Sequence, residues 1–339
     1  MIQVNFPQFR IVPKGFNVFV IVIICSLKYI KILLKISTYF FILTAKSQQM
    51  HAPDTQLLEA YQFCMAMARS HYENFPVASH LLKKDLRYPV SAVYAFARSA
   101  DDFADEGEHT EFERLSLLND FEEELDKIQA GLSSTHPVFI ALNDVINRFQ
   151  VPVSLFYNLL KAFKQDVIKT RYNNFSEILD YCTLSANPVG RILLYLNRSA
   201  DNANLNHSDA ICTGLQLINF YQDIAQDIDE NDRLYLPVDE MSQLSVSVSD
   251  LRQKINNEHT RELLKLQLQR ARSIYIQGRP LCKNLSGRFA VEIGVIYYGG
   301  MSVLRKLEQN TDNIYLRPRL TRQDKFNMLW RGLLCPFLF

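Results

Sequence analysis

Glycine is scarce in this chain, with only 11 among 339 residues. The sequence contains neither the G-x-G-x-x-G pattern of a dinucleotide-binding fold nor the G-x-x-x-x-G-K-[ST] pattern of a P-loop. Both patterns use glycine so that the backbone can approach phosphate groups closely. We therefore expect no nicotinamide cofactor and no P-loop nucleotide site.

Paired cysteines and an excess of charge are also missing. The six cysteines are scattered without a C-x-x-C pair, which favours reduced, buried thiols in a cytoplasmic protein over disulfides or a zinc site. The formal net charge is +1, so nothing in the composition indicates nucleic-acid binding. With 48% hydrophobic and 22% charged residues, the composition is that of a globular protein.

The first 49 residues lack an uninterrupted apolar run of membrane-spanning length. Residues 16–27 are almost entirely apolar, but Lys28, Lys31 and Lys35 follow before residues 38–43 become apolar again. A spanning helix needs about 18 consecutive apolar residues. Three interpretations stay open: a membrane-surface anchor, a short span, or upstream sequence translated in error. The polar stretch that begins at Met50 favours the third, and we expect residues 1–49 to lie outside the catalytic domain.

From residue 50 onward the sequence has the periodicity of successive helices. Asp54 is a suitable cap for the first helix, and Pro89 and Gly107 mark the start and end of the second. Further helices are expected at 111–130, 137–149, 152–168, 176–198, 208–228, 258–277 and 288–309. No stretch shows sustained strand alternation. The sequence predicts an all-α fold, with residues 50–318 forming one large helical domain around a central cavity.

Residues 319–339 form an amphipathic C-terminal segment that contains the one tryptophan of the chain. Two interpretations stay open for this segment. It docks on the domain as a terminal helix, or it makes peripheral, reversible contact with a membrane surface.

Two pairs of aspartates carry most of the functional information. Asp101 and Asp105 form one pair, and Asp223 and Asp227 form the other. The i,i+4 spacing places both carboxylates of a pair on one face of a helix, where like charges repel. A single pair of this kind is more often solvated surface. Two matched pairs on otherwise apolar helices favour a shared cavity, and hard oxygen ligands of this type suit Mg²⁺.

Other polar side chains extend these pairs or follow them in the sequence. They are Tyr94 and Arg98 near the first pair, Gln216 and Asn219 before the second, and the arginines Arg171 and Arg233. Arginine donates two parallel hydrogen bonds to phosphate oxygens, so the arginines fit a diphosphate whose remaining charge is balanced by Mg²⁺. Most of the 22 Phe and 16 Tyr must belong to the hydrophobic core, but an apolar channel lined by aromatic side chains is also what a long isoprenoid would require.

The succession of HYENFP, YAFARSADDFADE, KTRY, YCTLSANPVG, LQLINFYQDIAQD and RLYLP resembles the squalene/phytoene synthase family over about residues 60–310. The resemblance implies the isoprenoid synthase fold, prenyl diphosphate substrates and three Mg²⁺ ions. It implies metal ligands at Asp101, Asp102, Asp105, Asn219, Asp223 and Asp227. It implies diphosphate or metal contacts at Arg98, Tyr172, Gln216 and Asn219, with Tyr172 and the four paired aspartates catalytic. It places His71, Phe75 and Tyr94 in the substrate cavity.

Three details resemble the hydroxysqualene synthase branch of that family, which belongs to hopanoid biosynthesis. They are HYENFP, the segment Ser185–Arg191 (SANPVGR), and Gln222 where an arginine commonly precedes the second aspartate pair. The expected reaction converts presqualene diphosphate and water to hydroxysqualene and diphosphate with Mg²⁺. The alternatives are head-to-head condensation of farnesyl diphosphate, and a non-catalytic scaffold of the same fold. We expect a cytoplasmic protein with peripheral membrane contact.

Overall fold

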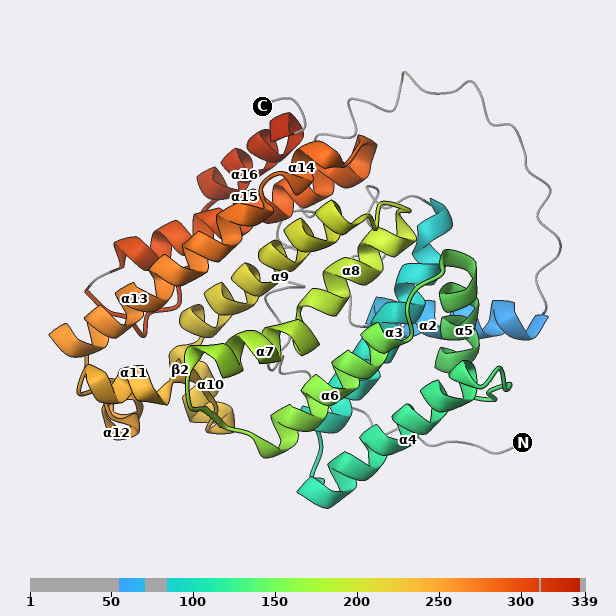
Figure 1. The fold of residues 1–339 in the computed structure, drawn as a ribbon, viewed down its shortest axis with the longest axis horizontal. Helices are drawn as coiled ribbons and strands as arrows, with labels where there is room; N and C mark the ends of the chain where they lie inside the picture. The colour runs from blue at the N-terminus through green and yellow to red at the C-terminus, as the bar shows by residue number, and fades with distance from the viewer. Residues whose placement is uncertain (1–54, 71–83, 311, 336–339) are drawn as a thin grey trace.

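The structure is a computed structural model that describes residues 55–70, 84–310 and 312–335. The described part of the chain is helical almost throughout (Figure 1), so the predicted all-α fold is confirmed. His71, Phe75 and the segment of residues 1–49 lie outside the described residues. No helix among the described residues is both long enough and apolar enough to cross a bilayer.

The first half of the fold packs around one hydrophobic cluster. Its elements are α2 (Thr55–Ser70), η1 (Lys84–Leu86), α3 (Arg87–Asp105), α4 (Glu111–Gln129), α5 (Pro137–Phe149) and α6 (Ser154–Ile168). Phe96, Phe121, Phe139 and Phe156 form its aromatic centre. Helix starts follow local chemistry, since Thr110 and Glu113 form a capping box at α4 and Pro137 begins α5.

The second half contains the remaining elements and a second cluster. They are β1 (Arg171–Tyr172), α7 (Phe175–Ser185), α8 (Asn187–Leu196), α9 (Asn202–Gln222), α10 (Ile224–Asn231), β2 (Leu234–Pro237), α11 (Val238–Gln243), α12 (Val248–Arg252), α13 (Glu258–Tyr275), η2 (Ile276–Gly278), α14 (Leu281–Asn284), α15 (Gly287–Gln309) and α16 (Arg322–Leu334). Leu193 packs against both clusters, so the two halves adjoin.

Two of the predicted helices are each split in the structure. The stretch 176–198 breaks at Ala186 between α7 and α8, where Pro188 in the first turn of α8 has no amide hydrogen to continue the helix of α7. The stretch 208–228 starts earlier, at Asn202, and breaks at Asp223 between α9 and α10. Both breaks fall beside the pocket described below.

The two strands pair in parallel, β1 with β2, and are too short to show alternation in the sequence. This pairing brings the segment after α6 next to the segment after α10. It thereby places Arg233 and Tyr235 close to the end of α6.

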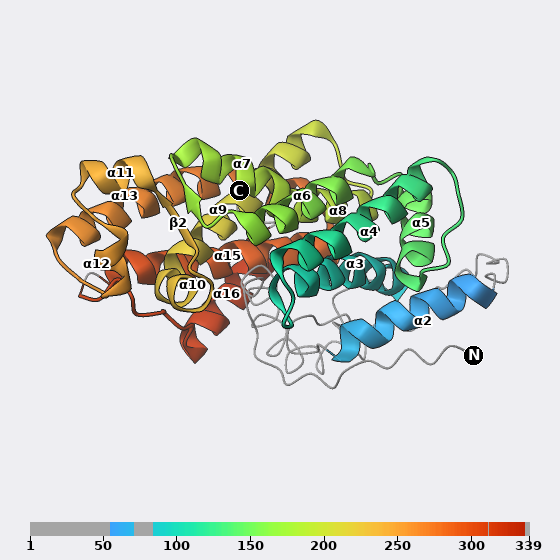
Figure 2. The same cartoon turned by 90° about the horizontal axis from the view of Figure 1, so that it is seen from below.

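The C-terminal helix α16 docks along α15 through its inner face. Met328 and Leu329 are buried with Val295, and a Cβ added at Gly332 would lie 2.5 Å from the Val295 side chain. Figure 2 shows α16 on the outside of α15. Its other face leaves Phe326 and Trp330 exposed.

Candidate active site

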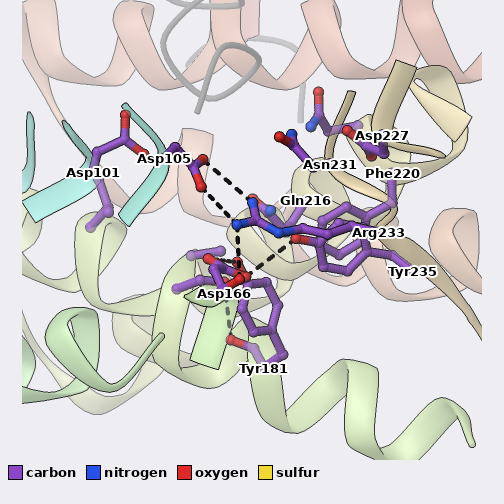
Figure 3. Close-up of a pocket in the computed structure, with 14 residues that line it drawn as sticks. Asp101, Asp105, Asp166, Tyr181, Gln216, Phe220, Asp227, Asn231, Arg233 and Tyr235 are labelled. Atoms are coloured by element: carbon purple, nitrogen blue, oxygen red, sulfur yellow. Dashed lines mark hydrogen bonds and ion pairs between the residues drawn. The ribbon is translucent and has the colours of Figure 1, made fainter. Parts of the chain in front are cut away.

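One pocket gathers side chains from both halves of the fold (Figure 3). It encloses about 660 Å³ of empty space, counting the part that opens to solvent. Its lining consists of Asp101, Asp105, Asp166, Tyr181, Ser185, Ala186, Val189, Gln216, Asn219, Phe220, Asp227, Asn231, Arg233 and Tyr235. Asp101 and Asp105 project from α3 on one side, Asp227 and Asn231 from α10 on the other, with Arg233 between them. The two predicted aspartate helices therefore face a common pocket.

The first aspartate pair is neutralised by arginines from two directions. Arg98 lies on the same helix and its guanidinium is 3.1 Å from Asp101 and 2.5 Å from Asp102. Arg233 reaches from the second half, with Nη2 2.7 Å from Asp105 Oδ1. Neither Arg98 nor Asp102 lines the pocket. The structure thus gives Arg98 the position of a counter-ion behind the pocket.

The second pair is divided between the pocket and an external arginine. Asp223 lies at the break between α9 and α10, and Arg317 binds both of its oxygens, at 2.5 and 3.0 Å. Asp223 does not line the pocket, whereas Asp227 does. The amide of Asp227 donates to the carbonyl of Asp223 at 2.9 Å, so one helical turn persists across the break. The two carboxylates therefore keep the predicted spacing.

Burial and like charge act strongly on these carboxyl groups. Burial, followed by repulsion from Asp105, raises the pKa of Asp101 well above its usual value. Burial, followed by repulsion from Asp223, does the same to Asp227. Burial also raises the pKa of Asp166 to about 7, against the attraction of Arg233. An added cation would relieve the cost of ionising all three groups.

Several predicted residues lie apart from the pocket. Arg171 binds Asp232 with 2.6 Å between Nη2 and Oδ1, on the outer side of β1. Tyr172 is almost fully buried, and its hydroxyl accepts a hydrogen bond from the Gln165 amide at 3.2 Å. Neither residue lines the pocket, and nor does Tyr94 of α3, whose pKa burial raises to about 12.

A carboxyl–tyrosine cluster at the base of the pocket has no counterpart among the predicted residues. Asp166 accepts hydrogen bonds from the hydroxyls of Tyr181 at 2.7 Å and Tyr235 at 3.3 Å. Its backbone carbonyl accepts from Arg233 Nη2 at 2.8 Å. Tyr235 in turn stacks on Phe220 with ring centroids 3.8 Å apart. Tyr181 and Tyr235 stand within the motifs YCTLSANPVG and RLYLP, so the signal was present, but Asp166 carries no local pattern.

The donor set of the pocket fits a hard divalent cation. Carboxylates of Asp101, Asp105 and Asp227 line it together with Asn219, whose side-chain oxygen is buried and accepts no hydrogen bond from the described residues. Carboxylate and amide oxygens are the ligands that Mg²⁺ takes. Across residues 55–70, 84–310 and 312–335, however, no three acidic, histidine or cysteine side chains converge closely enough to hold an ion. Asp101, Asp105 and Asp223 are instead each paired with an arginine.

Comparison with known proteins places the chain in a family. The squalene/phytoene synthase family model matches residues 68–324, and the chain belongs to this family. It is 32% identical over 250 residues to a hydroxysqualene synthase of Rhodopseudomonas palustris, covering 73% of this chain and 84% of that enzyme. It is 36% identical over 181 residues to a hydroxysqualene synthase of Zymomonas mobilis, covering 53% of this chain and 59% of that relative.

The fold agrees with this placement. A crystal structure of a squalene synthase from Alicyclobacillus acidocaldarius superposes with a TM-score of 0.71 and 33% identity. The match covers 77% of this chain and 97% of that one. The predicted isoprenoid synthase fold and the predicted family are therefore confirmed.

Proposed function

We propose that this protein converts presqualene diphosphate and water to hydroxysqualene and diphosphate, with Mg²⁺ required. The observation that carries the proposal is the single pocket that gathers Asp101, Asp105, Asp227 and Asn219 from helices of both halves of the fold. The match to the Rhodopseudomonas palustris hydroxysqualene synthase over 84% of that enzyme supports the branch.

The segments that carry the branch resemblance lie at or near this pocket, where the structure describes them. Ser185, Ala186 and Val189 of the SANPVGR segment line it, and Pro188 starts the helix that presents Val189. The Gln222 amide donates to the carbonyl of Pro318 at 2.9 Å, which ties the end of α9 to the segment that carries Arg317. An arginine at position 222 would add a cation beside Asp223. The SANPVGR residues in the lining and the glutamine at position 222 both support a site shaped for a different substrate from that of the condensing enzymes.

The residues divide the chemistry between two regions of the pocket. Asp101, Asp105, Asp227 and Asn219 would hold Mg²⁺, which supplies Lewis-acid stabilisation of the departing diphosphate. Arg233 exchanges its carboxylate partner for phosphate oxygens when the diphosphate enters, because a guanidinium binds either anion with the same two-pronged geometry. The C–O bond of the substrate then ionises, and diphosphate takes the bonding electron pair.

The aromatic side of the pocket suits the carbocation that remains. The stacked rings of Phe220 and Tyr235 present an electron-rich surface of the kind that stabilises cations. Ala186 and Val189 add apolar side chains to the pocket lining. Ring opening of the cyclopropylcarbinyl cation gives an allylic cation, and one water captures it to form the alcohol.

Two other functions are separated from this proposal by product analysis. A head-to-head synthase would convert farnesyl diphosphate alone to a C30 product, and a scaffold protein would convert nothing. We expect the protein to consume presqualene diphosphate with Mg²⁺, to release one diphosphate per hydroxysqualene, and to give no C30 product from farnesyl diphosphate. Efficient condensation of farnesyl diphosphate would overturn the branch assignment and leave the family unchanged.

A hydrocarbon substrate and product also favour a membrane-associated protein in the cytoplasm. We propose reversible contact with the bilayer surface, from which a long-chain substrate enters the pocket. The exposed aromatic side chains of α16 support this extension of the proposal.

A further inference from the structure

The proton of the Tyr181 hydroxyl is engaged by a neighbouring carboxyl. It donates to Asp166 Oδ2 at 2.7 Å, a short hydrogen bond between a phenol and a buried carboxyl. No described residue donates a hydrogen bond to the Tyr181 oxygen. Since Tyr181 lines the pocket, the lone pairs of its oxygen are available to a small molecule inside it. The hydroxyl is therefore oriented as an acceptor toward the pocket.

Asp166 is fixed in place from three sides. Tyr235 donates a second hydrogen bond to its other carboxyl oxygen at 3.3 Å, and Arg233 binds its backbone carbonyl at 2.8 Å. Asp166 itself lines the pocket, between Arg233 and Tyr181 (Figure 3), and its carboxyl oxygens accept from both tyrosine hydroxyls. A molecule bonded to the Tyr181 oxygen is therefore linked to this carboxyl through one further hydrogen bond.

We propose that Tyr181 and Asp166 form the pair that positions the attacking water and takes its proton. This inference rests on the proposed function, because that reaction requires one water to be held beside the cation and deprotonated. The water donates a hydrogen bond to the Tyr181 oxygen, which aims one lone pair of the water at the allylic cation.

The step balances in atoms and charge. The water oxygen forms the new C–O bond, its proton moves to the Tyr181 oxygen, and the Tyr181 proton moves to the Asp166 carboxylate. The electron pair of the broken C–O bond has already left with diphosphate. The pKa of Asp166, raised to about 7 by burial, makes this carboxylate a far better proton acceptor than an exposed aspartate.

The surroundings of Tyr181 agree with this role. The Ser185 hydroxyl donates to the Tyr181 carbonyl at 3.0 Å, so the tyrosine belongs to the same helix end as the SANPVGR segment. Ser185 and Ala186 line the pocket beside it. The segment that distinguishes the branch by sequence therefore adjoins the tyrosine to which water capture is assigned here.

The test measures product partition, in which water capture and ionisation are separate readouts. The variants are Tyr181→Phe, which removes the acceptor, and Asp166→Asn, which keeps a hydrogen-bond acceptor for Tyr181 and removes the basic carboxylate. Diphosphate release and alcohol formation are both measured from presqualene diphosphate with Mg²⁺. We expect both variants to release diphosphate while the alcohol formed per diphosphate falls at least about ten-fold, with elimination to a hydrocarbon in its place.

The chain provides a matched control pair. Tyr61 of α2 donates to Asp144 of α5 at 2.6 Å, an equally short tyrosine–carboxyl hydrogen bond whose residues do not line the pocket. Tyr61→Phe and Asp144→Asn should keep the alcohol-to-diphosphate ratio of the parent protein. Circular dichroism identifies which site variants are folded, and either of the two alone is sufficient for the test.

The outcomes are distinct. An unchanged alcohol-to-diphosphate ratio in the folded site variants overturns the proposal, even if their turnover is slow, because the pair would then act in ionisation or only in stability. Failure of the parent protein to form any alcohol overturns the proposed function itself. A reduced ratio in Tyr181→Phe and Asp166→Asn but not in the controls supports the water-positioning role.

Discussion

Arg233 and Asp105 stand 128 positions apart in the chain, and their side chains meet inside the pocket at 2.7 Å. Both side chains are mostly buried, with exposed fractions of 12% and 8%. Removing one partner of such a pair leaves a buried charge uncompensated, which costs far more than the pair contributes in net stability. The carboxylate left behind faces a second carboxylate, Asp101, on the same helix.

We therefore expect Arg233→Gln to lower the free energy of unfolding by about 3 kcal/mol in the absence of divalent cations. Adding Asp105→Asn should recover much of this loss, because the orphaned charge is removed. The control is Arg252→Gln, which breaks an ion pair with Asp232 whose partners are 54% and 53% exposed and should cost about 1 kcal/mol or less. Urea denaturation measures the free energy of unfolding of all three variants. Equal losses of stability in Arg233→Gln and Arg252→Gln would contradict the buried-pair interpretation.

Glu292 of α15, which is not one of the pocket residues, should make the stability of the protein depend on pH. Burial raises its pKa from 4.5 to about 7, and no described residue makes an ion pair or hydrogen bond with its side chain. Between these two values the folded protein holds a proton that the unfolded chain has released. Stability due to this group therefore falls as pH rises from about 4.5 to 7 and is constant above that.

Glu292→Gln removes this titration. We expect the variant to gain stability over the parent protein as pH rises, with little gain at pH 4.5 and at most about 3 kcal/mol at pH 8. Urea denaturation at the two pH values measures the difference. The same change at Glu59, on the exposed side of α2, should give no pH-dependent gain. A gain at Glu292 that is equal at both pH values would show that ionisation is not its cause.

The outer face of α16 carries the prediction about membranes. Phe326, Trp330 and Leu333 recur at helical spacing and are 61%, 56% and 43% exposed. Arg322, four residues before Phe326, is exposed on the same side of the helix, so the face combines apolar side chains with a basic one. We expect Phe326→Ser with Trp330→Ser to reduce co-sedimentation with anionic lipid vesicles at least about ten-fold.

An exposed apolar residue elsewhere in the fold serves as the control for nonspecific hydrophobic adsorption to vesicles. Phe112 of α4 is 80% exposed, and Phe112→Ser should leave vesicle binding unchanged. Point changes are preferable to deleting residues 326–339, because Met328 and Leu329 of the same helix pack against α15. Vesicle binding that survives loss of both aromatics would exclude α16 as the contact.

How far the sequence predicts this molecule depends on whether a feature is local. The bounds of α4 and α5 follow from caps, a proline and apolar spacing, and the predicted ranges match to within one residue. The breaks at Ala186 and Asp223 were missed, because apolar periodicity continues through both. Pro188 is a local signal for the first break, whereas no local pattern marks the second. Arg317 pairs with Asp223 across 94 positions, a choice that no local pattern encodes.

The residues of the site also divide into those that a local pattern predicts and those that depend on contacts distant in sequence. The aspartate pairs were predictable from i,i+4 spacing, because that spacing is a property of one helix. Asp166 was not, because its position depends on α7 and β2 bringing Tyr181 and Tyr235 to the end of α6. Family resemblance selected Tyr172, which the structure buries behind the pocket, while Tyr181 from the adjoining motif lines it.

The aspartates themselves carry the last prediction. Asp101→Asn and Asp223→Asn should each reduce turnover of presqualene diphosphate by orders of magnitude, because each removes a charged group from the ionisation step. Both variants should remain folded, since burial already raises the pKa of both carboxyls and a neutral amide relieves that cost. Asp229→Asn is the control, because Asp229 lies on α10 near Asp227 but pairs with Lys254 at the surface.

Steady-state kinetics over a Mg²⁺ titration, with circular dichroism on each variant, measures this prediction. The amide variants should require more Mg²⁺ for half-maximal rate, whereas Asp229→Asn should match the parent protein. Asp223 tests the arrangement most sharply, because in this structure it binds Arg317 and must exchange that partner in order to take part. Unimpaired turnover in Asp223→Asn would confine the metal site to Asp101, Asp105, Asn219 and Asp227, and unimpaired turnover in both variants would contradict the mechanism.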